Sequence, residues 1–130
     1  MTTQELRVVL TMDDFDNAVA FFRDALGLEE LAVWQNDGGH GVLLDAGHAT
    51  LEIFDHAQAE AIDRIEVGRR VTGQVRLALQ VPDSDATAHV LVGAGAEIIG
   101  GPVMTPWRDR NVRLVGPEGL QLTLFTLPDE

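Results

Sequence analysis

The chain contains two related copies of one segment, and this internal repeat constrains the fold more than any other feature. Residues 6–14 (LRVVLTMDD) reappear as residues 75–83 (VRLALQVPD), 69 positions later. The segment 51–54 (LEIF) returns as 122–125 (LTLF), 71 positions later. The small difference between the two offsets indicates an insertion within a loop of the second half. Two copies of one supersecondary unit are the simplest explanation.

The first half of the chain has the pattern of a strand, a helix and three further strands. Residues 6–11 alternate between apolar and mixed positions, as a strand does. Asp13 and Asp14 can cap the helix that follows, because a carboxylate accepts hydrogen bonds from the free N–H groups at a helix start. Gly27 ends the apolar helical spacing of this segment. Three short strands are expected next, at residues 31–35, 41–45 and 50–54.

The second half repeats this order. A helix begins at Asp83 or Ser84 and ends near Val92, and the glycines that follow close it. Four strands are expected, at residues 75–81, 103–105, 111–115 and 120–127. The fold class predicted is therefore α+β, with two tandem βαβββ modules that form curled mixed sheets around a cleft.

The repeat also sets the expected domain organisation. We expect a single domain over residues 1–130, made of one βαβββ module (4–56), a connector (57–73) and a second module (74–127). Within the connector, residues 57–66 (AQAEAIDRIE) are predicted to form a helix that covers apolar surface. Its buried residues would be Ala61, Ile62 and Ile65.

Composition excludes several classes of chemistry. All nine basic residues are arginine, and the chain has no lysine, cysteine or tyrosine, which removes Schiff-base lysines, thiol nucleophiles and cysteine metal sites. The formal net charge of −12 argues against nucleic acid as a partner. No apolar run approaches the ~18 residues of a membrane span, and the N-terminus does not resemble a signal peptide. We therefore expect a cytoplasmic protein with neither a membrane nor a nucleic-acid partner.

Three segments resemble the vicinal oxygen chelate superfamily, which includes glyoxalase I, bleomycin-resistance proteins and extradiol dioxygenases. Residues 14–28 (DFDNAVAFFRDALGL) resemble the first helix of the family. Residues 106–110 (PWRDR) are similar to the P-W-G segment of the bleomycin-resistance branch, and residues 116–119 (GPEG) to the turn before the last strand, with glycine in place of the usual aspartate. The resemblance covers almost the whole chain and is closest to the metal-independent, bleomycin-resistance-like branch. It implies a ligand cleft on the concave faces of the sheets.

The resemblance also identifies candidate site residues. Metal-dependent members of the family carry His, Gln or Glu at four positions, on the first and last strands of each half. The corresponding residues here are Arg7, Glu52, Arg76 and Thr123. Only Glu52 is a usual metal ligand, because a guanidinium group has donors and no free lone pair. We therefore expect no metal and no cofactor. The two arginines and Glu52 either bind an oxyanion of a ligand or form an internal ion-pair network.

Aromatic residues give the other candidate contacts. In drug-binding relatives, aromatic side chains at the cleft margin stack on planar ligand groups, which here implies roles for Trp34 and Trp107. Phe54 would supply an apolar wall. The alternative for each is packing in the core.

The function predicted is metal-independent binding of a small molecule, as in antibiotic or metabolite sequestration, by a homodimer with no catalytic residue. The alternative is a lyase, isomerase or dioxygenase that uses a divalent metal ion at Glu52 together with a displaced histidine, His40 or His48. A third hypothesis is a protein–protein interaction module that uses the cleft face.

Overall fold

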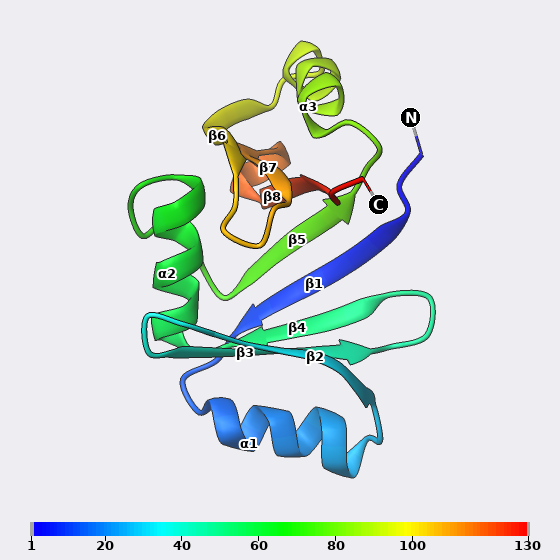
Figure 1. Cartoon of the computed structure of the whole chain (residues 1–130), viewed down its shortest axis with the longest axis vertical. Helices are drawn as coiled ribbons and strands as arrows, with labels where there is room; N and C mark the ends of the chain where they lie inside the picture. The colour runs from blue at the N-terminus through cyan, green and yellow to red at the C-terminus, as the bar shows by residue number, and fades with distance from the viewer. Residues whose placement is uncertain (1, 130) are drawn as a thin grey trace.

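The computed structural model describes residues 2–129 and contains the two predicted βαβββ units in succession (Figure 1). The elements of the first unit are β1 (Glu5–Thr11), α1 (Phe15–Val19), its π-helical continuation η1 (Ala20–Ala25), β2 (Glu29–Asn36), β3 (Gly39–Asp45) and β4 (Thr50–Phe54). Helix α2 (His56–Glu66) links the units. The elements of the second unit are β5 (Val75–Gln80), α3 (Ser84–Gly93), β6 (Glu97–Met104), β7 (Arg110–Val115), the short 3-10 turn η2 (Pro117–Gly119) and β8 (Gln121–Thr126).

All eight strands belong to one curled sheet, in the order β2-β3-β4-β1-β5-β8-β7-β6 (Figure 1). The pairs β1–β4 and β5–β8 are parallel, whereas the remaining pairs are antiparallel. The two units are joined by antiparallel pairing of β1 with β5, which sets Arg7 opposite Ala78 and Val9 opposite Arg76. The predicted fold class is confirmed, and the expected curled sheets are continuous through this central pair.

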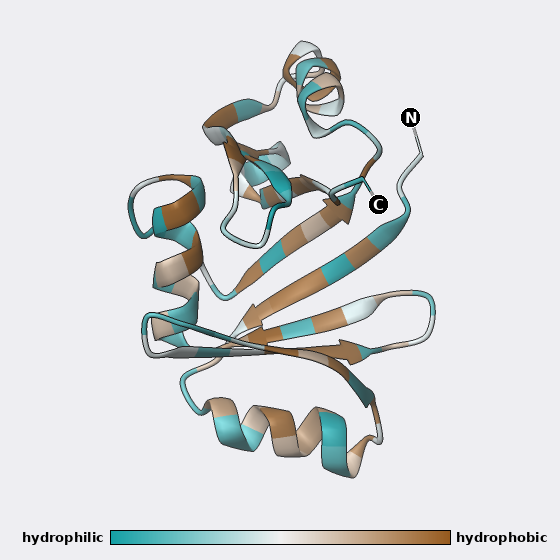
Figure 2. Ribbon diagram, viewed as in Figure 1, coloured by the Kyte–Doolittle hydropathy of each residue, from teal (hydrophilic) through white to brown (hydrophobic). Residues whose placement is uncertain are grey.

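Each helix covers a separate part of the sheet. In Figure 1, α1 and α3 lie at opposite ends of the molecule. In Figure 2, polar bands interrupt the apolar colouring of β1, β4 and β5, because successive side chains of a strand point to opposite sides of the sheet. Three buried clusters follow. One lies under α1 (Ala18, Val19, Val42, Leu44, Ile53), one under α3 (Val81, Ala88, Val112, Leu114, Leu124) and one under α2 (Val9, Phe54, Ala59, Ile62, Ala78, Phe125).

Helix α2 packs on the concave side of the sheet, and two glycines allow its close approach. A Cβ atom added to Gly39 of β3 would lie 2.1 Å from the backbone nitrogen of Gln58. A Cβ atom added to Gly100 of β6 would lie 2.2 Å from the carbonyl oxygen of Glu66. The start of α2 therefore packs on β3 and its end on β6, and the helix covers the concave side of the sheet between these two strands.

The local predictions differ from the structure in two places. The predicted caps are confirmed, since Asp14 accepts a hydrogen bond from the Asn17 backbone N–H at 3.0 Å and Asp83 from that of Ala86 at 3.1 Å. Strand β6, however, is much longer than the predicted 103–105, because Gly100 and its neighbours interrupt the side-chain alternation while the backbone stays paired with β7 through register shifts. The first helix changes to π-helical geometry over η1. Within residues 2–129, every helix is too short or too polar to cross a membrane.

Candidate functional site

A cavity of about 120 Å³ lies between the central strands and α2. Its floor is buried, whereas Trp34 and Trp107 in its lining are half-exposed, so the cavity opens to solvent on their side. All seven residues predicted to form the site are brought together there: Arg7, Trp34, Glu52, Phe54, Arg76, Trp107 and Thr123.

Arg7 on β1 is held from two sides. Its guanidinium group donates two hydrogen bonds to the carboxylate of Glu5, at 3.1 and 3.2 Å. The remaining terminal nitrogen, Nη1, lies 3.9 Å from Oε2 of Glu52, and the group stacks 4.6 Å from the centre of the Phe125 ring. Because Glu5 already balances its charge, Arg7 contributes little net positive charge to the cavity.

Arg76 on β5 is in a different situation, although both arginines line the same cavity. Only 3% of Arg76 is exposed. Its Nη1 donates a 2.7 Å hydrogen bond to the hydroxyl of Thr123, while its Nε has no hydrogen-bond partner among residues 2–129. Burial lowers the pKa of Arg76, and the nearby charge of Arg113 lowers it further. In the described part of the chain no carboxylate lies within 4.0 Å of this guanidinium group, so the predicted Arg7–Glu52–Arg76 contact forms only between Arg7 and Glu52.

The carboxyl group of Glu52 does not behave as the sequence suggests. Two neighbouring arginines favour its ionised form, which predicts a lowered pKa. In the structure, burial raises the pKa of Glu52, and the charges of Arg7 and Arg76 oppose this shift without overcoming it. Burial outweighs the two guanidinium groups here, because Arg7 stays 3.9 Å away and Arg76 donates to Thr123 instead.

A second carboxyl group, from Asp109, lies at the open side of the cavity. Its Oδ2 accepts a 3.1 Å hydrogen bond from the indole N–H of Trp107, which fixes the ring against the inner core. Burial raises the pKa of Asp109, partly offset by this hydrogen bond. The cavity thus combines two arginines, two carboxyl groups with raised pKa and aromatic walls.

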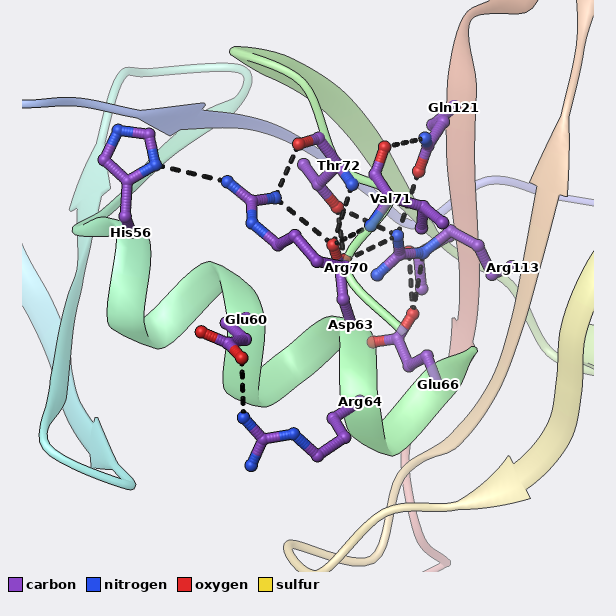
Figure 3. Close-up of polar contacts among 11 residues, drawn as sticks. His56, Glu60, Asp63, Arg64, Glu66, Arg70, Val71, Thr72, Arg113 and Gln121 are labelled. Carbon is purple, nitrogen blue, oxygen red and sulfur yellow. Dashed lines mark hydrogen bonds and ion pairs between the residues drawn. The ribbon is translucent and has the colours of Figure 1, made fainter. Parts of the chain in front are cut away.

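Behind the cavity lies a buried ion-pair network that the sequence prediction missed (Figure 3). Arg113 on β7 is fully buried and lies 2.9 Å from Oδ1 of Asp63 and 3.1 Å from Oε1 of Glu66, both on α2. Burial would raise the pKa of Asp63, but hydrogen bonds from Thr72 and Val71 and the charge of Arg113 hold it below its ordinary value. Buried charges need such pairing because desolvation is costly, although Nη2 of Arg113 has no hydrogen-bond partner within residues 2–129.

The signal for this network was present in the sequence of α2. Ala59, Ile62, Asp63 and Glu66 have the i, i+3, i+4, i+7 spacing of one helix face, and the two apolar members suggested that this face is buried. Two carboxylates on a buried face require cationic partners, which only arginine can supply in this chain. The sequence does not show which of nine arginines that is, because Arg113 lies 47 residues from Glu66.

Comparison with known proteins identifies the family. Residues 6–124 match the model of the Glyoxalase/Bleomycin resistance protein/Dioxygenase superfamily. The chain belongs to this superfamily. A comparison with curated protein sequences gives no match.

Several solved structures share the fold. A hypothetical protein from Bacillus halodurans C-125 is 14% identical, with a TM-score of 0.74 and coverage of 100% of this chain and 98% of that one. Methylmalonyl-CoA epimerase from Mycobacterium tuberculosis is 19% identical, with a TM-score of 0.70 and coverage of 98% and 90%. The Streptomyces coelicolor epimerase, in complex with 2-nitronate-propionyl-CoA, is 20% identical, with a TM-score of 0.68 and coverage of 98% and 100%.

The side chains at the expected metal-ligand positions do not suit a divalent metal ion, because two of the four offer N–H hydrogen-bond donors and no lone pair. Of the four positions that correspond to the family's metal ligands, Arg7 and Arg76 carry only donors and Thr123 receives a hydrogen bond from Arg76. Within residues 2–129, no three His, Cys, Asp or Glu side chains are grouped so that they could hold a metal ion.

The histidines do not supply the missing ligands. His40 bonds to Asp55 at 3.0 Å and His56 to Asp13 at 2.6 Å. All four histidines belong to the described chain, and they are exposed and lie outside the cavity lining: His40, His48, His56 and His89.

Proposed function

We propose that this protein binds a small organic molecule in the cavity without the help of a metal ion. The observation that carries the proposal is Arg76, a buried cation on the cavity floor that has no ion-pair partner within the described chain and an unused Nε donor. Buried charges are normally paired, so a ligand group that supplies the missing acceptor would be stabilised here. The aromatic side chains around it would pack against the rest of the ligand.

The size of the cavity favours a metabolite over a bulky antibiotic. Cavities of roughly 150 Å³ bind benzene, and this one measures about 120 Å³. Because the volume is somewhat smaller than a benzene-binding cavity, a single ring would fill it and its substituents would extend through the open side, whereas a large antibiotic would remain mostly outside. Sequestration or transport of such a molecule is the function that fits best within the glyoxalase superfamily. The homodimer stays a prediction, tested by light scattering.

Tryptophan fluorescence tests the proposal directly. Both tryptophans of the chain, Trp34 and Trp107, line the cavity, so an occupied cavity should change their emission. We expect saturable changes with small aromatic molecules, lost when the cavity is filled by Ala78→Phe. Unchanged emission and unchanged melting temperature with every neutral, anionic and cationic single-ring compound would contradict the proposal.

Metal analysis tests the alternative of a metal-dependent enzyme, for which the epimerase structures of the same fold are the reason to look. The expected result for untagged protein is less than one tenth of an equivalent of nickel, zinc, cobalt or iron. A stoichiometric metal that is lost on Glu52→Ala would overturn the metal-independent proposal.

A further inference from the structure

Two polar atoms in the cavity lining are buried and lack a hydrogen-bond partner in residues 2–129. They are Nε of Arg76 on β5 and Oδ1 of Asn111 on β7. The first is a donor and the second an acceptor. A buried polar group without a partner is unfavourable, and native proteins leave few of them. A ligand that satisfies both atoms must therefore carry an acceptor and a donor.

The orientation of Asn111 is fixed by its neighbour. Its Nδ2 donates a 3.1 Å hydrogen bond to Oε2 of Glu66, whose other oxygen accepts from Arg113 and Thr123. Since a carboxylate can only accept, the NH₂ group must face Glu66, and the carbonyl oxygen is the atom left without a partner. An amide flip would remove this bond, so the unpartnered atom of Asn111 is an acceptor.

The charges in the lining limit the ligand further. Arg76 needs an anionic acceptor, which a carboxylate supplies best because it matches the planar guanidinium group. The carboxyl groups of Glu52, Glu66 and Asp109 also line the cavity and would repel a second anionic group. The aromatic walls and the volume of about 120 Å³ leave room for one ring.

We propose that the ligand is a single-ring aromatic monocarboxylate with an N–H or O–H donor on the ring. Its carboxylate accepts hydrogen bonds from Arg76, its ring lies among the aromatic walls, and its donor group bonds to Oδ1 of Asn111. This assignment rests on the proposed binding function and names the class of ligand for the same cavity.

Calorimetric titration of the wild-type protein with a small panel tests the ligand class. The panel contains acetate, benzoate, benzamide, benzylamine, 3-aminobenzoate and 4-aminobenzoate. Benzoate should bind about tenfold or more tighter than benzamide, and one aminobenzoate about threefold to tenfold tighter than benzoate. Tighter binding of benzylamine, or equal binding of acetate and benzoate, would overturn the assignment. If benzamide binds and none of the carboxylates does, the proposed binding function is retained and the assignment of a carboxylate ligand is wrong.

Two variants locate the contacts. Arg76→Met should abolish the preference for benzoate over benzamide, whereas Asn111→Leu should abolish only the gain from the amino group. Arg110→Met, which removes an exposed arginine paired with Asp85 at 2.8 Å, is the matched control and should leave both preferences intact. Circular dichroism shows whether each variant is folded. A folded Arg76→Met that still prefers benzoate to benzamide, or a folded Asn111→Leu that keeps the gain from the amino group, would overturn the assignment. Should either variant fail to fold, the wild-type panel still decides.

Discussion

Arg113 and Asp63 form a fully buried ion pair, with Nη1 of the arginine 2.9 Å from Oδ1 of the aspartate. The two residues lie 50 positions apart, one in the second βαβββ unit and the other on the helix between the units. Asp63 also accepts hydrogen bonds from the backbone N–H groups of Val71 and Thr72, at 2.8 and 2.7 Å (Figure 3). One carboxylate therefore ties α2, the loop before β5 and strand β7 together.

We predict that Asp63→Asn destabilises the fold strongly. The substitution removes one of the two carboxylate charges at buried Arg113, and loss of a buried charge partner typically lowers the free energy of unfolding by up to about 3–5 kcal/mol. Urea denaturation at pH 7 measures this loss. Glu60→Gln is the control on the same helix, because its pair with Arg64 is exposed and should contribute less than about 0.5 kcal/mol.

The pH dependence gives a second check on Asp63. Its pKa is lowered in the folded state, so its stabilising contribution is present above the ordinary value of 3.8 and is lost as the pH falls through the folded pKa. The difference between wild type and Asp63→Asn should therefore persist down to about pH 4 and shrink only in stronger acid. An equal difference at every pH would contradict this account.

The close approach of α2 to the sheet predicts that Gly39→Ala and Gly100→Ala are both destabilising. At each position the new methyl group would overlap backbone atoms of α2, which a side-chain rotation cannot relieve. Overpacking of this kind costs about 1–3 kcal/mol, and displacement of α2 should also weaken ligand binding. Gly93→Ala in α3 is the control, because a Cβ atom added there would have no neighbour within 4 Å. This variant should be neutral or stabilising by up to about 1 kcal/mol. Thermal denaturation distinguishes these outcomes.

The fold was predictable from the sequence because its determinants are local and repeated. Strand alternation, the capping carboxylates Asp14 and Asp83 and the glycine stops each act within a few residues, and the duplication doubles every signal. Strand β6 was predicted too short because what determines its first half is not local. Gly100 is placed there by its contact with Glu66, which lies in another element and leaves no local pattern.

The seven residues named from the sequence line one cavity, whereas Glu66, Asp109 and Asn111 of the same lining, and the contacts within it, were not predicted. Alternation along the central strands indicated which side chains share the concave face, and Arg7, Glu52 and Arg76 do line one cavity. The partners depend on tertiary distances that the sequence does not contain. Arg7 is held by Glu5, two residues away, while Arg76 binds Thr123, 47 residues away.

Glu52→Gln should stabilise the protein at neutral pH. The pKa of Glu52 is raised by burial above its ordinary value of 4.5, so the folded state holds this proton more tightly than the unfolded state. Its favourable contribution is present below about pH 4.5 and is lost as the pH rises through the folded pKa. Glutamine does not titrate, so the variant should match wild type near pH 4 and become more stable than it toward pH 8. Urea denaturation from pH 4 to pH 8 measures this difference, with Glu97→Gln at an exposed position as the control. A stability gain for Glu52→Gln that shrinks toward pH 8 would show that burial does not raise the pKa of Glu52.

The same carboxyl group should control the pH dependence of carboxylate binding. An ionised Glu52 repels a ligand carboxylate at Arg76, whereas the protonated form does not. Because burial raises the pKa of Glu52, this group takes up a proton at a higher pH than an ordinary carboxyl group, so benzoate should bind more tightly as the pH is lowered from 8 toward 5.5. Asp109, whose pKa burial also raises, would act in the same direction. Glu52→Gln should remove most of the pH dependence and Asp109→Asn the smaller remainder, as measured by calorimetric titration at a series of pH values. A wild-type affinity for benzoate that is constant over this range would show that Glu52 does not face the bound carboxylate.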